Sequence, residues 1–195
     1  MKTAAHAADA ATTREGIRAA QARIDDILRV FQAILRLAEI DAGGARARFG
    51  PVDLASIIER VADAYRPDIE AAGRRFIVDP LEKTEITGDG DLIAQALSNL
   101  LENAMRHTPA GSTIRVALRK GPGSIGIAIQ DNGPGIPEAG RARVLEPFVR
   151  LDSSRTTPGA GLGLSIVSSV ARLHGARLSL EDAKPGLKAV IDRPA

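Results

Sequence analysis

The chain has 195 residues, of which 44% are hydrophobic and 3% aromatic. This length allows one substantial hydrophobic core, or one domain with a helical appendage. Lysine and arginine outnumber aspartate and glutamate by only 26 to 24, and aromatic stacking groups are scarce, which argues against a nucleic-acid partner. The absence of cysteine excludes disulfides, thiolate metal sites and cysteine nucleophiles.

No apolar run in the sequence approaches the roughly 20 residues that span a bilayer, and the first residues contain no hydrophobic secretion core. We therefore expect a cytoplasmic location. A membrane anchor, such as one in an inner membrane, is expected only outside this chain.

The first predicted element is a long amphipathic helix from about Thr13 to Ala42. It ends at Gly43-Gly44, because glycine is the usual residue after the last turn of a helix. An apolar stripe of this width has to be buried against other helices, so we expect residues 1–44 to belong to a helical bundle. Its apolar positions recur at steps of three and four: Ile17, Ile24, Leu28, Phe31, Leu35 and Ala38, widened by Ile27 and Ile34.

After a linker at residues 45–51, helices and strands follow one another to the end of the chain. Alternation of apolar and polar residues predicts strands with one buried face and one solvent-exposed face. The sum is an α+β fold, a two-layer α/β sandwich with helices on one face of a sheet. We expect helices at Val52–Ala72, with a candidate kink at Pro67, at Asp91–His107 and at Leu162–Leu173, and strands at Arg75–Val78, Glu85–Thr87, Thr113–Arg119, Ser124–Asp131, Arg177–Leu180 and Leu187–Ile191.

Gly121, Gly123 and Gly126 match the spacing of the dinucleotide-binding fingerprint. That fingerprint must join a strand to a helix, whereas these glycines join two alternating strands. We interpret the segment as a hairpin turn.

Polar side chains gather on one face of the predicted helix 91–107, while the leucines between them serve the core. An amide oxygen such as that of Asn103 is a hard, neutral ligand that suits a magnesium ion already surrounded by phosphates. The alternative is an ordinary solvated helical face. The polar positions stand at i, i+4, i+7 and i+8: Asn99, Asn103, Arg106 and His107.

Asp131 ends the predicted strand 124–131, and period-two counting places its carboxylate on the buried side. A buried carboxylate is costly unless a donor satisfies it, and the amino group of an adenine would do so. The turn that follows, with Gly133, Gly135 and Ile136, lets a flat ring approach the backbone. The alternative is a structural aspartate that caps a turn or pairs with an arginine.

A glycine-rich run at Pro158–Leu164 opens directly into a helix, where free backbone amides and the positive dipole end attract phosphates. It is not a P-loop, because no Lys-Ser or Lys-Thr pair follows Gly163. The preceding segment Glu138–Thr157 has little periodicity, as expected of a mobile lid or of a solvated loop. It carries four arginines: Arg141, Arg143, Arg150 and Arg155.

Together these segments resemble the four motifs of the catalytic domain of bacterial sensor histidine kinases. Their order and spacing are highly specific, and the resemblance covers Val52 to the end, so residues 52–195 are expected to be the catalytic ATP-binding domain. Asn99–Pro109 resembles the N box, Asp131–Pro137 the first glycine box, Pro147-Phe148 with Arg150 the F box, and Gly159–Leu164 the second glycine box.

The resemblance implies the Bergerat ATP-binding fold shared with gyrase, the Hsp90 chaperones and MutL, with ATP and Mg²⁺ as ligands. It implies that Asp131 binds adenine, that Asn103 holds magnesium, and that Gly159 to Gly163 form the hinge of the lid. The nucleotide-binding set that it implies is Asn99, Asn103, Arg106, His107, Asp131, Gly133, Gly135, Ile136, Phe148, Arg150, Gly159, Gly161, Leu162, Gly163 and Leu164.

The long amino-terminal helix resembles the second helix of the family's dimerisation and phosphoacceptor hairpin. The family's nucleophilic histidine lies on the preceding helix, before an acidic residue and Leu-Arg-Thr-Pro, and nothing in this sequence matches it. His6 lacks that context, His107 belongs to the asparagine face, and His174 is explained by the cap and dipole of a helix end.

We therefore expect a chain that binds ATP and magnesium but carries no phosphoacceptor histidine of its own. We also expect it to form a homodimer through the amino-terminal helix, and to act with a separate acceptor helix and a response regulator.

Two other functions are open. A degenerate kinase-like interaction or phosphotransfer module would keep the fold without ATP turnover, although the intact glycine boxes argue against it. An ATPase of the gyrase or Hsp90 type needs a carboxylate that activates water about one helical turn before Asn103. This chain has Asn99 there, and Glu102 is turned off that face.

Overall fold

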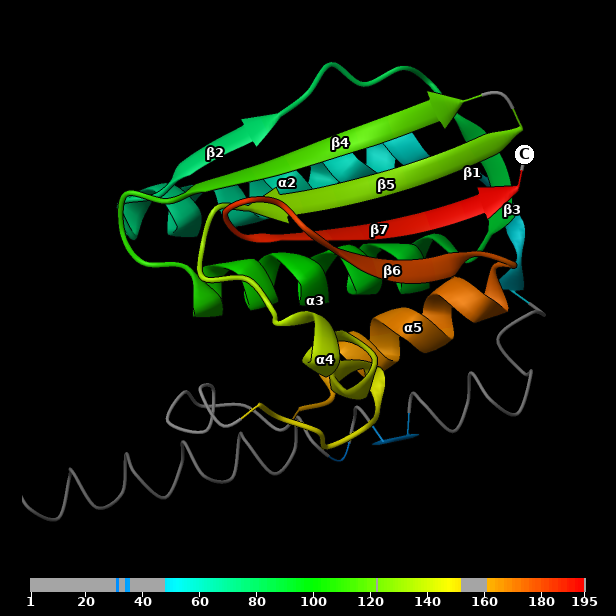
Figure 1. The fold of residues 1–195 in the computed structure, drawn as a ribbon. Coiled ribbons are helices and arrows are strands. Elements are labelled where there is room, and N and C mark those ends of the chain that lie inside the picture. The colour runs from blue at the N-terminus through cyan, green and yellow to red at the C-terminus, as the bar shows by residue number, and fades with distance from the viewer. Residues whose placement is uncertain (1–30, 32–33, 36–47, 122, 152–160, 195) are drawn as a thin grey trace, which may run out of the picture. The chain divides into compact units, whose positions relative to one another are not determined.

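The computed structural model describes Phe31, Ile34 and Leu35 and residues 48–121, 123–151 and 161–194 (Figure 1). The chain divides into two units, Met1–Arg36 and Leu37–Ala195. In the first unit the three described residues are helical and exposed. The remainder of the predicted helix 13–42 lies outside the described residues.

The described part of the second unit alternates helices and strands in the predicted order. Five strands form one sheet in the order β2-β4-β5-β7-β6, and β1 pairs with β3 in a separate two-stranded ribbon. The elements are β1 (Gly50–Asp53), α2 (Leu54–Ala71), β2 (Arg75–Val78), β3 (Glu85–Gly88), α3 (Gly90–His107), β4 (Thr113–Gly121), β5 (Ser124–Asp131), α4 (Glu138–Arg141), the 3₁₀ turn η2 (Arg143–Leu145), α5 (Gly163–Leu173), β6 (Arg177–Asp182) and β7 (Leu187–Pro194).

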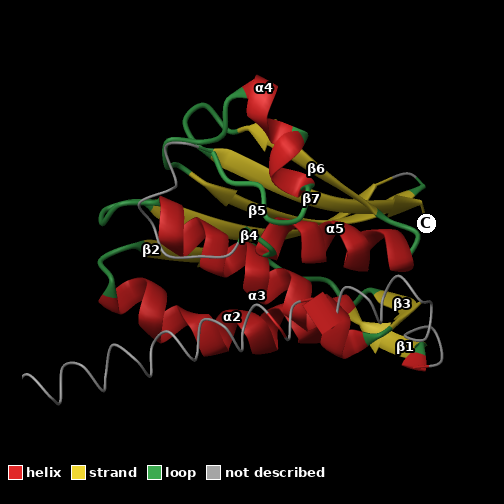
Figure 2. Cartoon of the chain, turned by 90° about the horizontal axis from the view of Figure 1, so that it is seen from below, coloured by secondary structure: helices red, strands yellow, loops and turns green. Residues whose placement is uncertain are grey.

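Helices α2, α3 and α5 lie along one face of the five-stranded sheet, which confirms the two-layer α+β sandwich (Figures 1 and 2). Among the described strands, β2 and β4 pair in parallel, and the other pairs are antiparallel. The pairing of Gly121 with Ser124 closes β4 and β5 into a hairpin, so the interpretation of the glycine fingerprint as a turn is confirmed.

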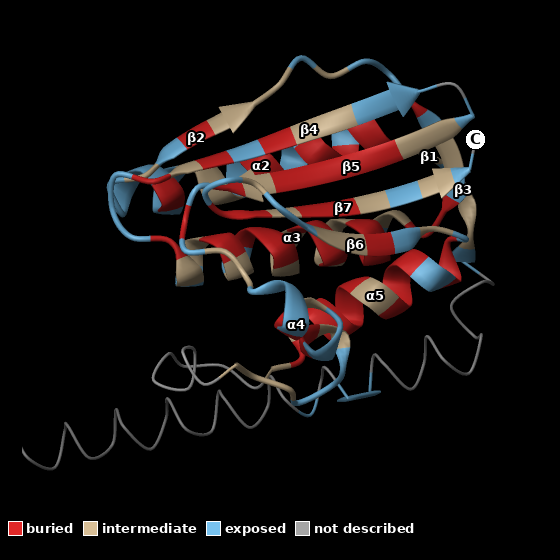
Figure 3. Cartoon of the chain, viewed as in Figure 1, coloured by how far each residue is buried: buried red, intermediate tan, exposed pale blue. Residues whose placement is uncertain are grey.

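The core lies between the sheet and its helices (Figure 3). Its α3 contribution is the apolar face predicted from the sequence, with Leu97, Leu100, Leu101 and Ala104 all buried. The largest fully buried side chains come from all three helices and from β4: Ile58, Ile69, Leu92, Leu97, Leu101, Ile114, Val116 and Val167. Burial of this face fixes the rotation of α3, and with it the direction of its polar face.

The predicted start of the second helix at Val52 is wrong. Residues 50–53 form β1 instead, because they pair with β3. The helix begins only after Asp53, whose carboxylate accepts hydrogen bonds from Ala55 N, Ser56 Oγ and Thr84 N. An aspartate at this position caps a helix and ends the strand before it. Helix α2 then runs past Pro67 to Ala71.

Smaller differences concern element ends. Helix α5 begins at Gly163, one residue later than predicted, and β4, β6 and β7 run two or three residues further than predicted. The short helix α4 and the turn η2 occupy part of the segment expected to be an irregular lid. None of the helices that the structure describes has both the length and the apolar character needed to cross a bilayer.

The carboxyl end of α3 is held by Arg74, which sequence reasoning did not single out. The last carbonyls of a helix have no partner within it. The Arg74 guanidinium donates to the carbonyl oxygen of Met105 at 2.7 Å and to that of Thr108, and its Nε donates to Thr108 Oγ1 at 2.9 Å. Arg74 therefore fixes the end of the helix that carries the polar face.

Replacing Arg74 with Met should lower the free energy of unfolding by about 1.5–3 kcal/mol, the usual contribution of hydrogen bonds to a charged group. The matched control is Arg75→Met, which removes the same charge from the exposed neighbouring side chain. Urea denaturation of both variants measures the difference. Equal effects would show that the contacts of Arg74 with α3 contribute nothing beyond charge.

Candidate functional site

Asp131 lies at the end of β5 with 7% of its surface exposed, which confirms its predicted inward position. Its Oδ1 accepts hydrogen bonds from Gly133 N at 2.8 Å and from Leu187 N at 3.3 Å. Burial raises the pKa of this carboxyl, and the two amides and the charge of His107 only partly offset the effect. The two backbone amides thus hold the carboxylate in place, but their hydrogen bonds do not cancel the free-energy cost of burying its charge.

The turn-capping alternative for Asp131 also applies, since the Gly133 bond closes the turn after β5. No arginine forms an ion pair with it within the part of the chain that the structure describes. One carboxylate therefore closes a turn and still has acceptor capacity for a ligand.

Glycines allow three segments to meet around Asp131. A Cβ at Gly133 would lie 2.9 Å from Thr108 Cγ2 and 3.1 Å from His107 O, so the turn packs directly against the end of α3. Gly135 has φ of 71°, and a Cβ there would lie 2.8 Å from Gly186 O. Gly186, between β6 and β7, lies so close that a Cβ would overlap the carbonyl oxygen of Asp131.

Sequence reasoning missed Gly186 and Leu187. The signal available was a Pro185-Gly186 turn before a strand with a buried first residue, which predicts a hairpin but not its contact with Asp131. That contact depends on the order of the strands, because β7 lies beside β5.

The polar face of α3 runs from Asn99 to His107. Asn99, Asn103 and His107 are half-buried, whereas Arg106 is exposed. Burial lowers the pKa of His107, the charges of Arg106 and Arg150 lower it further, and only Asp131 opposes them. His107, Asp131 and Arg150 are therefore electrostatic neighbours, although they come from three separate segments.

Asn99 has a buried amide nitrogen, Nδ2, with no hydrogen-bond partner among the described residues. An unmade bond of this kind costs about 1–3 kcal/mol. The position of Gly163, the first residue of α5, lies against this side chain, with 4.0 Å between Asn99 Cβ and a Cβ built on the glycine. The amino end of α5 and the polar face of α3 therefore form one site.

Among the described residues, no side chain caps the amino end of α5. Its N-cap residue, Leu162, makes no side-chain capping bond, and the first turn contains no acidic residue. The first backbone amides of the helix and its dipole are thus available to an anion. Gly161 has φ of 70°, and its carbonyl accepts from Phe148 N at 3.0 Å, which ties the glycine run to the preceding segment.

Some predicted site residues take other positions. Leu162 and Leu164 are buried in the core, so that only their backbone groups remain available for a ligand. Phe148 is 58% exposed, and Ile136 is half-buried in the glycine turn. Gly159 lies outside the described residues.

Of the arginines expected in the lid, Arg141 is tied to its surroundings, donating to Ile136 O at 2.9 Å and lying 3.9 Å from Asp182. Arg143 is exposed, and Arg155 lies outside the described residues. Arg150 is half-buried near His107. Arg150 is thus the described lid arginine whose charge acts on the pKa of His107 in the site.

The explanation of His174 by the dipole of a helix end is wrong in part. It does follow the last residue of α5, but it is 8% exposed and burial holds its pKa below the ordinary value. A neutral ring gains little from the negative end of a helix. His6 lies outside the described residues.

Comparisons with known proteins identify the family of the domain. The family model described as histidine kinase-, DNA gyrase B-, and HSP90-like ATPase matches residues 88–192, more than half of the chain. Sensor protein IrlS of Burkholderia pseudomallei is 35% identical over 165 residues, which cover 84% of this chain and 35% of IrlS. The chain spans about a third of the length of the relatives that it matches.

Two solved structures have a similar fold. The mycobacterial sensor histidine kinase MprB is 33% identical with a TM-score of 0.61, over 75% of this chain and 99% of that one. Full-length ShkA in complex with AMPPNP is 28% identical with a TM-score of 0.72, over 87% of this chain and 36% of that one. This chain therefore belongs to the histidine kinase-, DNA gyrase B- and HSP90-like ATPase family and carries the ATP-binding catalytic domain of a sensor histidine kinase.

Proposed function

We propose that this domain binds ATP with magnesium and positions the γ-phosphate for transfer to a histidine on a separate helix. Three features carry the proposal because they lie together: a buried carboxylate with too few donors, and an amide nitrogen and a helix amino end that have no partner among the described residues. These are Asp131, Asn99 Nδ2 and the first turn of α5. The complex of ShkA with AMPPNP, a nucleotide analogue, supports a nucleotide as the ligand.

The adenine ring is proposed to lie against the turn after β5. Its amino group would donate to the Asp131 carboxylate, which has acceptor capacity beyond the bonds from Gly133 and Leu187. Gly133 carries no side chain that could separate the ring from the backbone of the turn. Any side chain at this position would also collide with Thr108. His107, half-buried beside Asp131, would close the other side of the ring.

The triphosphate is proposed to run along α3 to the amino end of α5. Free amides of the first turn of α5 would bind phosphate oxygens, and Asn99 Nδ2 would gain the partner that it lacks. Arg106 and Arg150 add positive charge near this path.

The residues present fit a magnesium ion bound together with phosphates. No cluster of three His, Asp or Glu side chains occurs in the described ranges, so those ranges offer no cage of carboxylates for the ion. The Asn103 amide oxygen, with Asn99 one turn away, would hold magnesium whose other ligands are phosphate and water. The ion would neutralise charge on the phosphates.

The transfer would break the bond between the γ-phosphorus and its bridging oxygen, which leaves as part of ADP, and form a phosphorus–nitrogen bond on the acceptor imidazole, whose ring proton passes to a base on the acceptor helix or to water. The domain contributes positioning and charge stabilisation rather than covalent chemistry. His174 is unsuited as the acceptor, since both ring nitrogens are already bonded to the backbone. The acceptor helix, a response regulator and a homodimer formed through residues 1–44 complete the proposed system.

A water-activating ATPase of the gyrase or Hsp90 type fits the site less well. Asn99 stands where the activating carboxylate would be needed. Glu102 is exposed and accepts a hydrogen bond from Tyr65 Oη at 2.9 Å, away from the polar face. Slow hydrolysis at most is expected.

Asp131→Asn keeps Oδ1 as an acceptor but removes the buried charge. The folded-state pKa of Asp131 is raised above its ordinary 3.8, so the wild type loses stability as pH rises from 3.8 through that folded value. We expect this variant to melt no lower than the wild type at pH 7, with a difference that shrinks towards pH 4. Its affinity for ATP should fall about tenfold or more, because it loses a charge-assisted hydrogen bond.

Thermal melts across this pH range and calorimetric titration with ATP measure the two effects of Asp131→Asn separately. A variant that lost stability at pH 7 and kept its affinity would contradict both the burial argument and the assignment of adenine to Asp131.

Asn103→Ala should remove most of the magnesium-dependent part of ATP affinity, about 1–3 kcal/mol, since the amide oxygen is the proposed ligand. The control is Glu102→Ala, which changes the adjacent exposed residue. Titrations with and without Mg²⁺ measure both variants, and Glu102→Ala should bind as the wild type does. If neither variant changed the effect of magnesium, the assignment to Asn103 would be wrong. If the wild type bound no ATP at millimolar concentration, the interaction-module alternative would be favoured.

Incubation of this chain with γ-labelled ATP should leave no acid-labile label on it, because no histidine stands in an acceptor motif. Label should appear on a phosphoacceptor hairpin of a related kinase added in trans. Stable acid-labile label on this chain alone would refute the expectation.

A further inference from the structure

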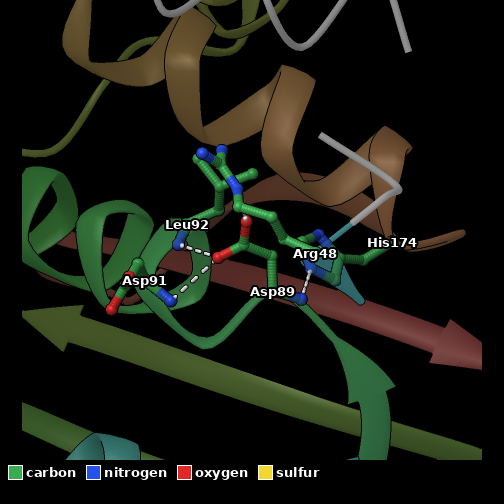
Figure 4. A network of polar contacts seen from close by, with 5 residues as sticks. All are labelled: Arg48, Asp89, Asp91, Leu92 and His174. Carbon is green, nitrogen blue, oxygen red and sulfur yellow. Dashed lines mark hydrogen bonds and ion pairs between the residues drawn. The ribbon is translucent and has the colours of Figure 1, made fainter. Parts of the chain in front are cut away.

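At the end of α3 and α5 remote from the candidate site, His174 joins the two helices (Figure 4). Its Nδ1 lies 2.8 Å from the carbonyl oxygen of Val170 in the last turn of α5. Its Nε2 accepts a hydrogen bond of 2.9 Å from the backbone N–H of Asp89, the N-cap of α3. One ring therefore bridges the last turn of one helix and the first turn of the other.

The two bonds define the protonation state of the ring. A carbonyl oxygen can only accept, so Nδ1 must carry the proton and Nε2 must offer its lone pair to Asp89 N–H. In an imidazolium both nitrogens carry protons, and Nε2–H would face Asp89 N–H. The bridge to α3 therefore forms only with a neutral ring.

The same cluster holds the two residues that precede β1. Phe49 stacks on the His174 ring, with 4.7 Å between centroids and 18° between planes. Arg48 Nε donates to Asp89 Oδ2 at 3.0 Å, while Asp89 Oδ1 accepts from the first-turn amides of Asp91 and Leu92 (Figure 4). The chain that enters the domain is thus attached to both helices.

Gly88 makes the close approach of the ring possible. A Cβ at this position would lie 2.7 Å from His174 Cδ2 and 3.0 Å from Nε2. The ring has little room to yield, because two hydrogen bonds and the Phe49 stack hold it. The site is therefore built around an imidazole of this size.

The surroundings of His174 favour the neutral ring. It borders an apolar cavity of about 40 Å³ together with side chains of α3, β5 and β7. Burial is the main reason that its pKa lies below 6.5, and the charge of Arg193 on β7 acts in the same direction. The bond to the Val170 carbonyl and the charge of Asp89 raise this pKa, but they do not outweigh burial, and the Asp89 carboxylate already accepts from Arg48 and two amides.

The bridge at His174 bears on the candidate site because α3 and α5 are continuous between the two ends. Asn99 lies within α3, and Gly163 opens α5 against it. Packed helices transmit a shift at one end to the other, since they deform little along their axes. Loss of the bridge would therefore change the spacing between Asn99 and the phosphate-binding turn.

We propose that neutral His174 is a positioning residue that joins Arg48 and Phe49, ahead of β1, to α3 and α5, and thereby sets the alignment of Asn99 with the amino end of α5. The inference rests on the proposed function for its effect on ATP, but the ring contacts themselves do not. Protonation of His174 breaks the bridge, and the entering chain and the site then lose their coupling.

The ring contact is tested in the full chain with Phe49→Trp, which introduces the sole tryptophan. An imidazolium in contact with an indole quenches its fluorescence, so emission should fall as pH is lowered, with a midpoint below 6.5. The matched control adds His174→Gln, whose amide oxygen keeps an acceptor for Asp89 N–H but cannot be protonated. It should abolish this step, and a step that persisted in the double variant would overturn the proposal.

The coupling is tested by calorimetric titration with MgATP at pH 7.5. Phe49→Ala and His174→Ala should weaken binding about fivefold or more, the lower range of coupling between sites, and His174→Gln should restore most of the loss. When the pH is lowered to 5.5, the wild type should lose more affinity than His174→Gln. Protonation of His107, Asp131 and the nucleotide affects both proteins alike, so the difference reports on His174.

Unchanged affinity in folded Phe49→Ala, or an equal pH dependence in the wild type and His174→Gln, would overturn the coupling. If His174→Ala does not fold, Phe49→Ala and His174→Gln still decide. Failure of the wild type to bind ATP would instead refute the proposed function, and the tryptophan titration would still show whether His174 holds Phe49.

Discussion

Asp131 is a carboxylate buried at the end of a central strand, and the candidate site is arranged around the cost of that burial. β5 lies between β4 and β7, so its last residue is enclosed by Ile114 on one side and by the turn before Leu187 on the other. Two backbone amides hold the side chain in position but leave its pKa raised. A folded protein that keeps such a group loses stability that a bound donor would restore, which is a common signature of a binding site.

The remaining parts of the site depend on close backbone approaches that only glycine permits. Gly133 meets the end of α3, Gly135 meets Gly186, and Gly186 meets Asp131. Each contact joins segments that are distant in sequence, so a single substitution would separate two walls of the site. Arg74 adds to this rigidity, since it holds the carboxyl end of α3 against which Gly133 packs.

The motif residues were predictable because each belongs to a local pattern. Asparagines at i and i+4, a carboxylate at the end of an alternating strand and glycines before a helix indicate positions that sequence spacing alone can identify. Arg74, Gly186 and His174 belong to no such pattern. The contacts of Arg74 with Met105, of Gly186 with Asp131 and of His174 with Asp89 join residues 31 to 85 positions apart, and nothing local in the sequence indicates those pairings. The strand at residues 50–53 was missed for the same reason, because its partner β3 lies beyond the whole of α2.

The sequence by itself determined the fold class, the order of elements, the apolar face of α3 and the family, since these follow from periodicity and from motifs read along the chain. The tertiary structure decided which segments close around Asp131, that Leu162 and Leu164 are core residues, and that His174 bridges two helices. Strand order and helix packing create these contacts. They arise from the burial of apolar surface over the whole domain, and no short stretch of residues encodes them.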